Sequence, residues 1–164
     1  MVQHVRETIV DAVKTQIERI GVDSTVTWAV DSSPGTKFRD GIRTRKLDQD
    51  GMSLASLPDC LLVPRTETTA RDGAGGTSSR YGATMSLLID IWFESFDMSE
   101  DASRVLHDVE LIFGIDPQFG GVCRDSRITG NRTFISEDQQ PLTGIQVTAE
   151  IDYGYFEDDP ATLA

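Results

Sequence analysis

A chain of 164 residues is long enough for one domain with its own hydrophobic core. With 38% hydrophobic and 26% charged residues, and no apolar run of the ~20 residues that span a bilayer, the composition predicts a soluble globular domain. The net charge of −12 argues against wrapping nucleic acid, because proteins that do so gather Lys and Arg on one face. An acidic wall along which DNA passes without binding would also carry such a charge, since carboxylates repel phosphates.

The remaining composition bears on compartment and on metal chemistry. The N-terminal "MVQHVRETIV" lacks the basic start and apolar middle of a signal peptide, so a cytoplasmic location is expected. Cys60 and Cys123 lie far apart, and the expected role is that of small buried residues, with a disulfide or a reactive thiol as alternatives. His4 and His107 stand at no ligand spacing, so no transition-metal site is expected.

The first two predicted elements are a helix and a strand. Apolar side chains recur at helical spacing through residues 2–20, and Gly21 follows where a left-handed cap would end an amphipathic helix. Residues 25–30 alternate apolar and small polar side chains, as in a strand with one buried face.

A basic segment, residues 36–46, follows a turn at "SSPG" and runs against the overall charge of the chain. Five of the fifteen Lys and Arg residues lie in it: Lys37, Arg39, Arg43, Arg45 and Lys46. Two interpretations remain open, a solvated loop or a docking surface for an acidic partner, including an acidic face of a neighbouring copy. Contacts of the second kind are head-to-tail, and such contacts close into rings when the rotation per subunit allows it.

Two strands and a loop are predicted between residues 60 and 94. Residues 60–68 read as a strand interrupted at Pro64, which favours an edge or irregular position. The Gly- and Ser-rich segment 69–82 predicts a long flexible loop that links two strands. The strand within "MSLLIDIWFESFD" alternates strictly, and its core face is Met85, Leu87, Ile89, Ile91 and Phe93.

The opposite face of that strand carries Asp90, Trp92 and Glu94. The acids therefore point away from the core, toward solvent or a partner. Trp92 is unusual on a purely solvated face, so contact with another chain and ordinary surface exposure both remain open.

The second half of the chain predicts a helix, a break and two strands. A helix is expected over about residues 100–114, and the "DPQFGG" segment ends it. Residues 126–135 predict a hairpin or a bulged strand. Residues 145–155 have the cleanest alternation in the sequence, with Glu150 and Asp152 on the polar face, and the acidic end 157–164 is expected to be loose.

The order of these elements resembles the tail terminator, or tail completion, proteins of long-tailed bacteriophages. The resemblance is carried by the strand "TMSLLIDIWFESF", the helix "SEDASRVLHDVELIFGID", the Gly-Gly break in "DPQFGG" and the ending "DYGYFEDDP", and it covers about residues 2–160. The basic segment departs from the family pattern because it is longer and more charged.

The resemblance implies one α/β domain of the α+β type over residues 1–164, with a mixed, mostly antiparallel sheet and both main helices on one face. It implies a structural virion protein with no catalytic, cofactor or metal site, which assembles as a hexameric ring at the head-proximal end of the tail. Such a ring caps the tail tube, stops its polymerisation and joins the head. Its partners are the tail tube protein and a head-completion or neck protein, and DNA passes through its lumen without specific binding.

Two groups of residues are candidates for these contacts. The candidate subunit or tube interface is Lys37, Arg39, Arg43, Arg45, Lys46 and Trp92. The candidate lumen or acidic face is Asp90, Glu94, Glu150 and Asp152. Their acidity would repel DNA, and the basic segment would offset the repulsion between acidic subunits.

Two other functions remain open. A neck connector on the head side of the same junction would share the acidic lumen and the ring. A small cytosolic hydrolase that uses carboxylates is the alternative from another class, but the sequence has no G-x-S-x-G elbow, and "DGAGGTSS" lacks the lysine of a phosphate-binding loop.

Overall fold

The computed structural model describes residues 4–20, 43–46, 58–72, 80–95, 98–135 and 142–156, and for residues 43–46 it describes the backbone only. The predicted strand 25–30, the basic residues Lys37 and Arg39, and the acidic end 157–164 lie outside the described residues. No described helix is long and apolar enough to cross a membrane.

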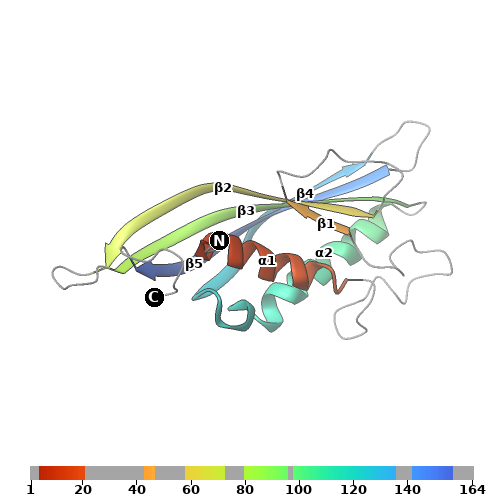
Figure 1. Ribbon diagram of the computed structural model, residues 1–164. Coiled ribbons are helices and arrows are strands. Elements are labelled where there is room, and N and C mark those ends of the chain that lie inside the picture. Colours follow the sequence, from red (N-terminus) through yellow and green to blue (C-terminus); the bar gives the residue numbers. More distant parts are fainter. Residues whose placement is uncertain are drawn as a thin grey trace.

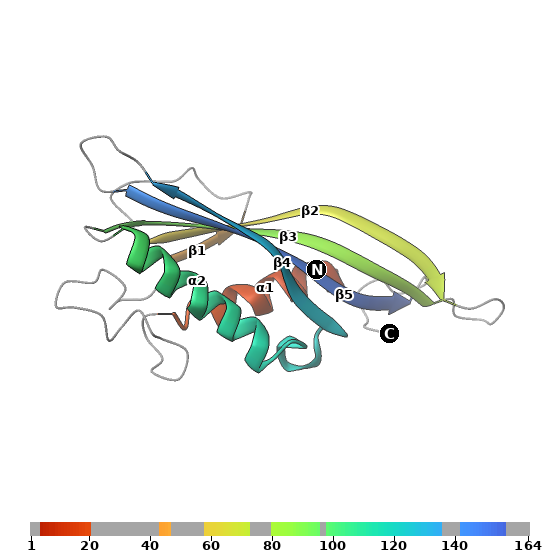
Figure 2. The same cartoon turned by 180° about the vertical axis from the view of Figure 1, so that it is seen from behind.

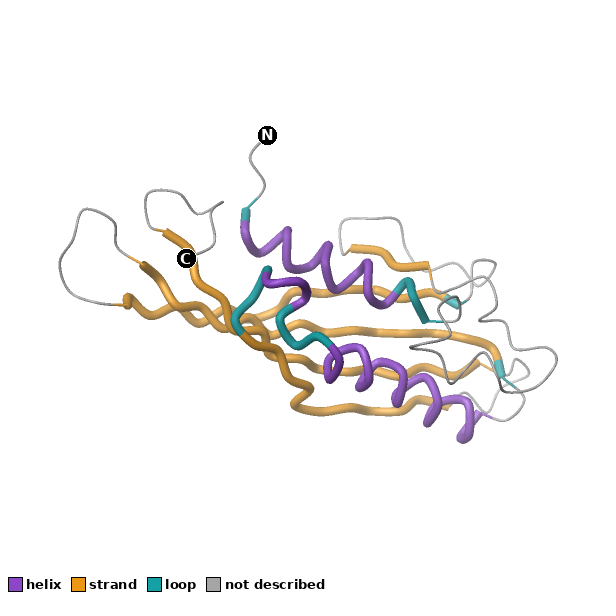
Figure 3. The backbone as a smooth tube through the Cα atoms, turned by 90° about the horizontal axis from the view of Figure 1, so that it is seen from below, coloured by secondary structure: helices purple, strands orange, loops and turns teal. Residues whose placement is uncertain are grey.

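The described residues form a two-layer α+β domain, in which two helices cover one face of a five-stranded sheet (Figures 1 and 3). The elements are α1 (Val5–Ile17), β1 (Arg43–Lys46), β2 (Asp59–Asp72), β3 (Arg80–Glu94), α2 (Met98–Ile115), the short 3-10 turn η2 (Phe119–Gly121), β4 (Asp125–Ile135) and β5 (Leu142–Phe156). The strand order is β1-β2-β3-β5-β4, with β1 parallel to β2 and every other pair antiparallel. The predicted fold class is confirmed.

The core lies between the sheet and the two helices. All five residues assigned from the alternation to the core face of β3 are fully buried, and so are Ile145, Val147, Ala149 and Ile151 of β5. The apolar stripe of α1, including Ile9 and Val13, packs against them together with Val105 and Val109 of α2. The period-2 pattern in the strands and the period-3.6 pattern in the helices therefore meet in one hydrophobic layer.

The helix ends differ slightly from the predicted ones. The His4 side chain caps α1, since its Nδ1 accepts a hydrogen bond from the Arg6 N–H at 3.1 Å. The regular helix stops at Ile17, but a hydrogen-bonded turn continues to Ile20, whose side chain is fully buried. The second helix, α2, begins at Met98 and so starts earlier than the expected residue 100.

The Gly/Ser-rich segment is shorter as a loop than predicted. The expectation of a loop over 69–82 is wrong at both ends, because Ala70–Asp72 of β2 pair with Arg80–Gly82 of β3. Cross-strand contacts favour the extension of β3 into this segment. The Tyr81 and Tyr155 rings stack with centroids 5.6 Å apart, and the Arg80 guanidinium lies over the Phe156 ring. Local composition does not show these partners, because they come from β5.

The paired ends of β2 and β3 form a hairpin arm, which we define as residues 65–72 and 80–86. Figures 1 and 2 show that this hairpin arm reaches beyond both helices. The pairing of β2 with β3 shifts between Pro64 and Glu67, and β1 pairs only with Asp59–Leu62. The prediction of an irregular position at Pro64 is confirmed, and the shift marks the base of the hairpin arm.

The segment 126–135 is one bulged strand rather than a hairpin. The pairing of β4 with β5 shifts between Ile128 and Gly130, which places Thr129 at the bulge. Before β4, the chain turns tightly through Phe119, Gly120 and Gly121, which all have positive φ. The Phe119 ring is buried edge-to-face against Phe113, and this contact holds a residue that rarely adopts such a conformation.

Candidate assembly surface

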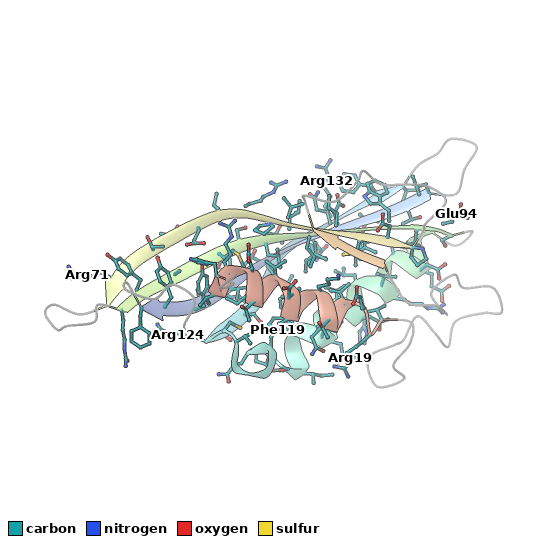
Figure 4. All side chains as sticks on the ribbon, viewed as in Figure 1. Arg19, Arg71, Glu94, Phe119, Arg124 and Arg132 are labelled. Atoms are coloured by element: carbon teal, nitrogen blue, oxygen red, sulfur yellow. The ribbon has the colours of Figure 1, made fainter. Side chains whose placement is uncertain are left out.

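The four predicted acids share one face of the sheet. Residues paired across antiparallel strands lie on the same face, and the register pairs Asp90 with Gln146, Ser86 with Glu150 and Thr84 with Asp152. Glu94 is four residues from Asp90 on the same strand and belongs to this face too. We call it the outer face, because it is turned away from α1 and α2; Figure 4 shows Arg132 on this side.

Glu150 and Asp152 form the ionic half of the outer face together with Arg127 of β4. The Arg127 guanidinium bonds to Glu150 at 2.7 Å and to Asp152 at 3.0 Å, and Thr84 Oγ1 donates to Asp152 at 2.6 Å. These carboxylates raise the pKa of Arg127, so it stays charged. The sequence reading missed Arg127, and only the β4–β5 register could have placed it between the two acids.

Trp92 lies in the other half of the outer face, where aromatic side chains from β3 and β4 meet over β5. Its indole stacks with the Phe134 ring at a centroid distance of 6.0 Å, and the Arg132 guanidinium lies 4.6 Å from the centre of that ring. Gly144, its partner on β5, leaves room for the indole, since a Cβ on Gly144 would lie 2.7 Å from the Trp92 ring. The sequence indicated Trp92 but gave no sign of Phe134 or Gly144.

Gly144→Ala should therefore destabilise the protein by about 1–3 kcal/mol, because the new Cβ would clash with the Trp92 indole and displace it from the sheet. Gly130→Ala is the matched control, since a Cβ there meets nothing within 4 Å, and it should change stability little or raise it slightly. Urea denaturation of both variants measures the difference. Equal stability of the two variants would contradict the described seating of Trp92.

Asp90 lies beside this aromatic group and is partly withdrawn from water. Its Oδ1 is buried and has no hydrogen-bond partner among the residues that the structure describes. Burial raises the pKa of Asp90, while the hydrogen bond from Trp92 and the charge of Arg65 act in the opposite direction. The register places Leu61 and Gln146 on either side of it, so this carboxylate is not a simple solvated acid.

The raised pKa predicts a definite pH dependence for an Asp90→Asn variant. A carboxyl whose folded pKa lies above its unfolded value favours folding when protonated, and this contribution is lost as pH rises through the folded pKa. At pH 7, Asp90→Asn should therefore be more stable than the parent chain, and the gain should vanish below the unfolded pKa of 3.8. Urea midpoints between pH 3 and 7 test this, with Glu150→Gln, whose acid is paired, as the control.

Apolar neighbours complete the aromatic half. Val63 pairs with Leu88 on the same face as Asp90, and Leu88 is 6% exposed. The outer face thus has an aromatic and apolar half around Trp92 and an ionic half around Arg127. The sequence predicted a single acidic face. In the structure this face has two different halves: Arg127 pairs with the acids of one half, and Trp92 and Phe134 lie in the other.

The described part of the basic segment, residues 43–46, lies at the edge of the sheet opposite β4, the strand that carries Arg127. Its residues Arg43, Arg45 and Lys46 belong to β1, which pairs with Asp59–Leu62. These residues form a strand, so the interpretation of residues 36–46 as a solvated loop does not hold for this part of the segment. Its side chains and the remaining basic residues lie outside what the structure describes.

A groove lies between α2 and the edge strand β4. It is lined by Glu110, Phe113, Gly114 and Ser126–Asn131, and none of the four predicted acids lines it.

No group of three His, Cys, Asp or Glu residues in the described ranges could hold a metal ion. Cys60 and Cys123 are both buried and form no disulfide, and burial with nearby carboxylates raises the pKa of the Cys123 thiol to about 12.

Comparison with known proteins adds no family to this geometry. No protein-family model matches the chain, and no curated protein matches its sequence.

Proposed function

We propose that this chain is a tail terminator of a long-tailed bacteriophage. It assembles as a hexameric ring on the last disc of the tail tube, stops tube polymerisation and offers the surface to which the filled head attaches. DNA crosses the acidic lumen of the ring during ejection without specific binding. The protein is structural, and its partners are further copies of itself, the tail tube protein and a head-completion or neck protein.

The observation that carries this proposal is the division of the outer face. Its aromatic half, with Trp92 stacked on Phe134, has the composition of a protein contact, in which aromatic residues and Arg are enriched. Its ionic half exposes carboxylates held in fixed positions by Arg127 and Thr84. A ring subunit needs both properties, one to bind a neighbour and one to face water or DNA.

The charge of the chain supports the same role. Each copy has a net charge of −12, so an assembly of six copies repels phosphates. Repulsion between the copies must be offset locally, and the cations of the basic segment can supply the offset. The Oδ1 atom of Asp90 fits this view, because it has no hydrogen-bond partner among the described residues and is an acceptor for a cation of a neighbouring copy.

Loss of the protein from the phage that encodes it tests the proposal. Tails assembled without a terminator should vary in length and exceed the normal length, because nothing halts the tube. A neck connector on the head side of the junction would give a different result: tails of normal length, unattached to heads. Electron micrographs of lysates with the gene deleted, and with it restored from a plasmid, decide between these outcomes.

A further inference from the structure

At each of its two edges, the sheet has strand backbone with which no described strand pairs. At one edge, β1 covers only Asp59–Leu62 of β2, so no described strand pairs with the outer side of Val63–Asp72. At the other edge, β4 is the last strand in the sheet order. Open edges of this length are templates for pairing with another chain, and proteins normally keep them short or blunt them.

We infer that the outer edge of β2 in one copy pairs with β4 of the next copy, which extends the sheet from subunit to subunit. The strand directions permit it. Three antiparallel steps separate β2 from β4 (β2 to β3, β3 to β5, β5 to β4), so the two strands run in opposite directions. When a second copy continues the sheet, its β2 meets β4 in the antiparallel arrangement, which is the more stable of the two pairings.

The two edges also match in length and chemistry. The outer edge of β2 spans Val63–Asp72 and β4 spans Asp125–Ile135. Thr66, Thr68 and Thr69 of β2 are exposed and β-branched, as is common in paired strands. Main-chain hydrogen bonds would supply the affinity, as in other complexes that add a strand to a sheet edge.

The groove beside β4 offers room for the incoming side chains. Phe113 of α2 and Ile128 of β4 give it an apolar floor, and Glu110 and Asn131 give it polar rims. A strand added to β4 directs alternate side chains toward this groove and toward the outer face. On β2, Thr69 lies on the helix side and Thr68 and Ala70 lie on the outer face, as their partners Ala83, Thr84 and Gly82 show.

A two-fold pairing of β4 with β4 is disfavoured by charge. Antiparallel self-pairing centred on the bulge would place Arg127 opposite Arg132 of the other copy, and like charges directly opposite one another destabilise a sheet. Pairing between β2 and β4 joins different surfaces of the two copies. Such head-to-tail contacts close into a ring when the rotation per subunit allows it, so the inference extends the proposed function, yet it requires only that the chain associates with itself.

Hydrogen exchange of the full-length protein tests the inference without assuming a register. Within Val63, Arg65–Arg71 and β4, the amides that point away from the strand already paired in the same copy should gain protection, at least about tenfold, when concentrated, assembled protein is compared with dilute monomer. Amides at the N-terminal turn of α2 serve as an internal reference and should not change. Assembly with unchanged exchange at both edges would overturn the inference while leaving the proposed ring intact.

Cysteine pairs provide the second test. Thr68→Cys and Ala70→Cys, each combined with Arg132→Cys, place both thiols on the outer face, and one of these combinations should form covalent multimers under mild oxidation. Thr69→Cys with Arg132→Cys is the matched control, since its thiols lie on opposite faces. Multimers in the control alone, or a monomer at all concentrations, would overturn the inference. Multimers that fail to cap tail tubes would overturn the terminator role but not the edge pairing.

Discussion

An Ile89→Ala variant should lose about 2–5 kcal/mol of unfolding free energy, the largest stability effect that we expect from one substitution. Ile89 is fully buried at the centre of β3, and β3 itself is the middle strand of the sheet. It pairs with Leu62 on one side and Val147 on the other, and both of these residues are fully buried. Removing its side chain leaves a cavity that rigid strands on both sides cannot fill.

Urea denaturation followed by circular dichroism measures this loss. Ile135→Ala is the control, because Ile135 is 47% exposed and its truncation should cost less than about 0.5 kcal/mol. Because assembly would add to the apparent stability, both variants are compared at a concentration where the parent chain is monomeric. A loss below about 1 kcal/mol for Ile89→Ala would contradict the core described between the sheet and the helices.

Neutralising the four outer-face acids should increase the retention of duplex DNA by the assembled protein. A variant with Asp90→Asn, Glu94→Gln, Glu150→Gln and Asp152→Asn keeps the side-chain shapes but removes the charges. At low salt the assembly should retain duplex DNA on the order of tenfold more strongly than the parent, because the carboxylates that repel phosphates are gone and Arg127 and Arg132 remain. The retention should fall steeply as salt is added.

A second variant controls for net charge. Glu7→Gln, Asp11→Asn, Glu18→Gln and Glu100→Gln remove the same number of charges from the two helices and the turn after α1, on the opposite side of the sheet. Filter binding of both variants over a range of salt concentrations compares the two surfaces. Equal retention by both variants would show that total charge, rather than the outer face, governs DNA exclusion.

The repeating patterns in the sequence predicted the fold because burial acts on every residue of an element. The alternation of Met85–Phe93 and of Ile145–Tyr153 identified both central strands and their core faces, and the stripe from Val5 to Ile17 identified α1. Boundaries were less well predicted. Ala70–Asp72 and Arg80–Gly82 looked like loop because glycines lie nearby. In the structure they pair with each other, and Arg80–Gly82 also pair with β5, where Tyr81 stacks on Tyr155.

The candidate surface was only half visible in the sequence. Alternation assigned Asp90, Trp92, Glu150 and Asp152 to polar faces, and the register unites them on one face. The partners that give each its character come from other strands: Arg127 for the acids, and Phe134 for Trp92. Such partners depend on strand order and on the bulge at Thr129, and neither of these follows from local periodicity.

Negative-stain images of the purified protein, alone and mixed with isolated tail tubes, test the central claim most directly. A terminator should form six-fold rings with six times the mass of the 18.1 kDa chain, and these rings should cap one end of each tube. Monomers that leave both tube ends bare at every concentration would contradict the account.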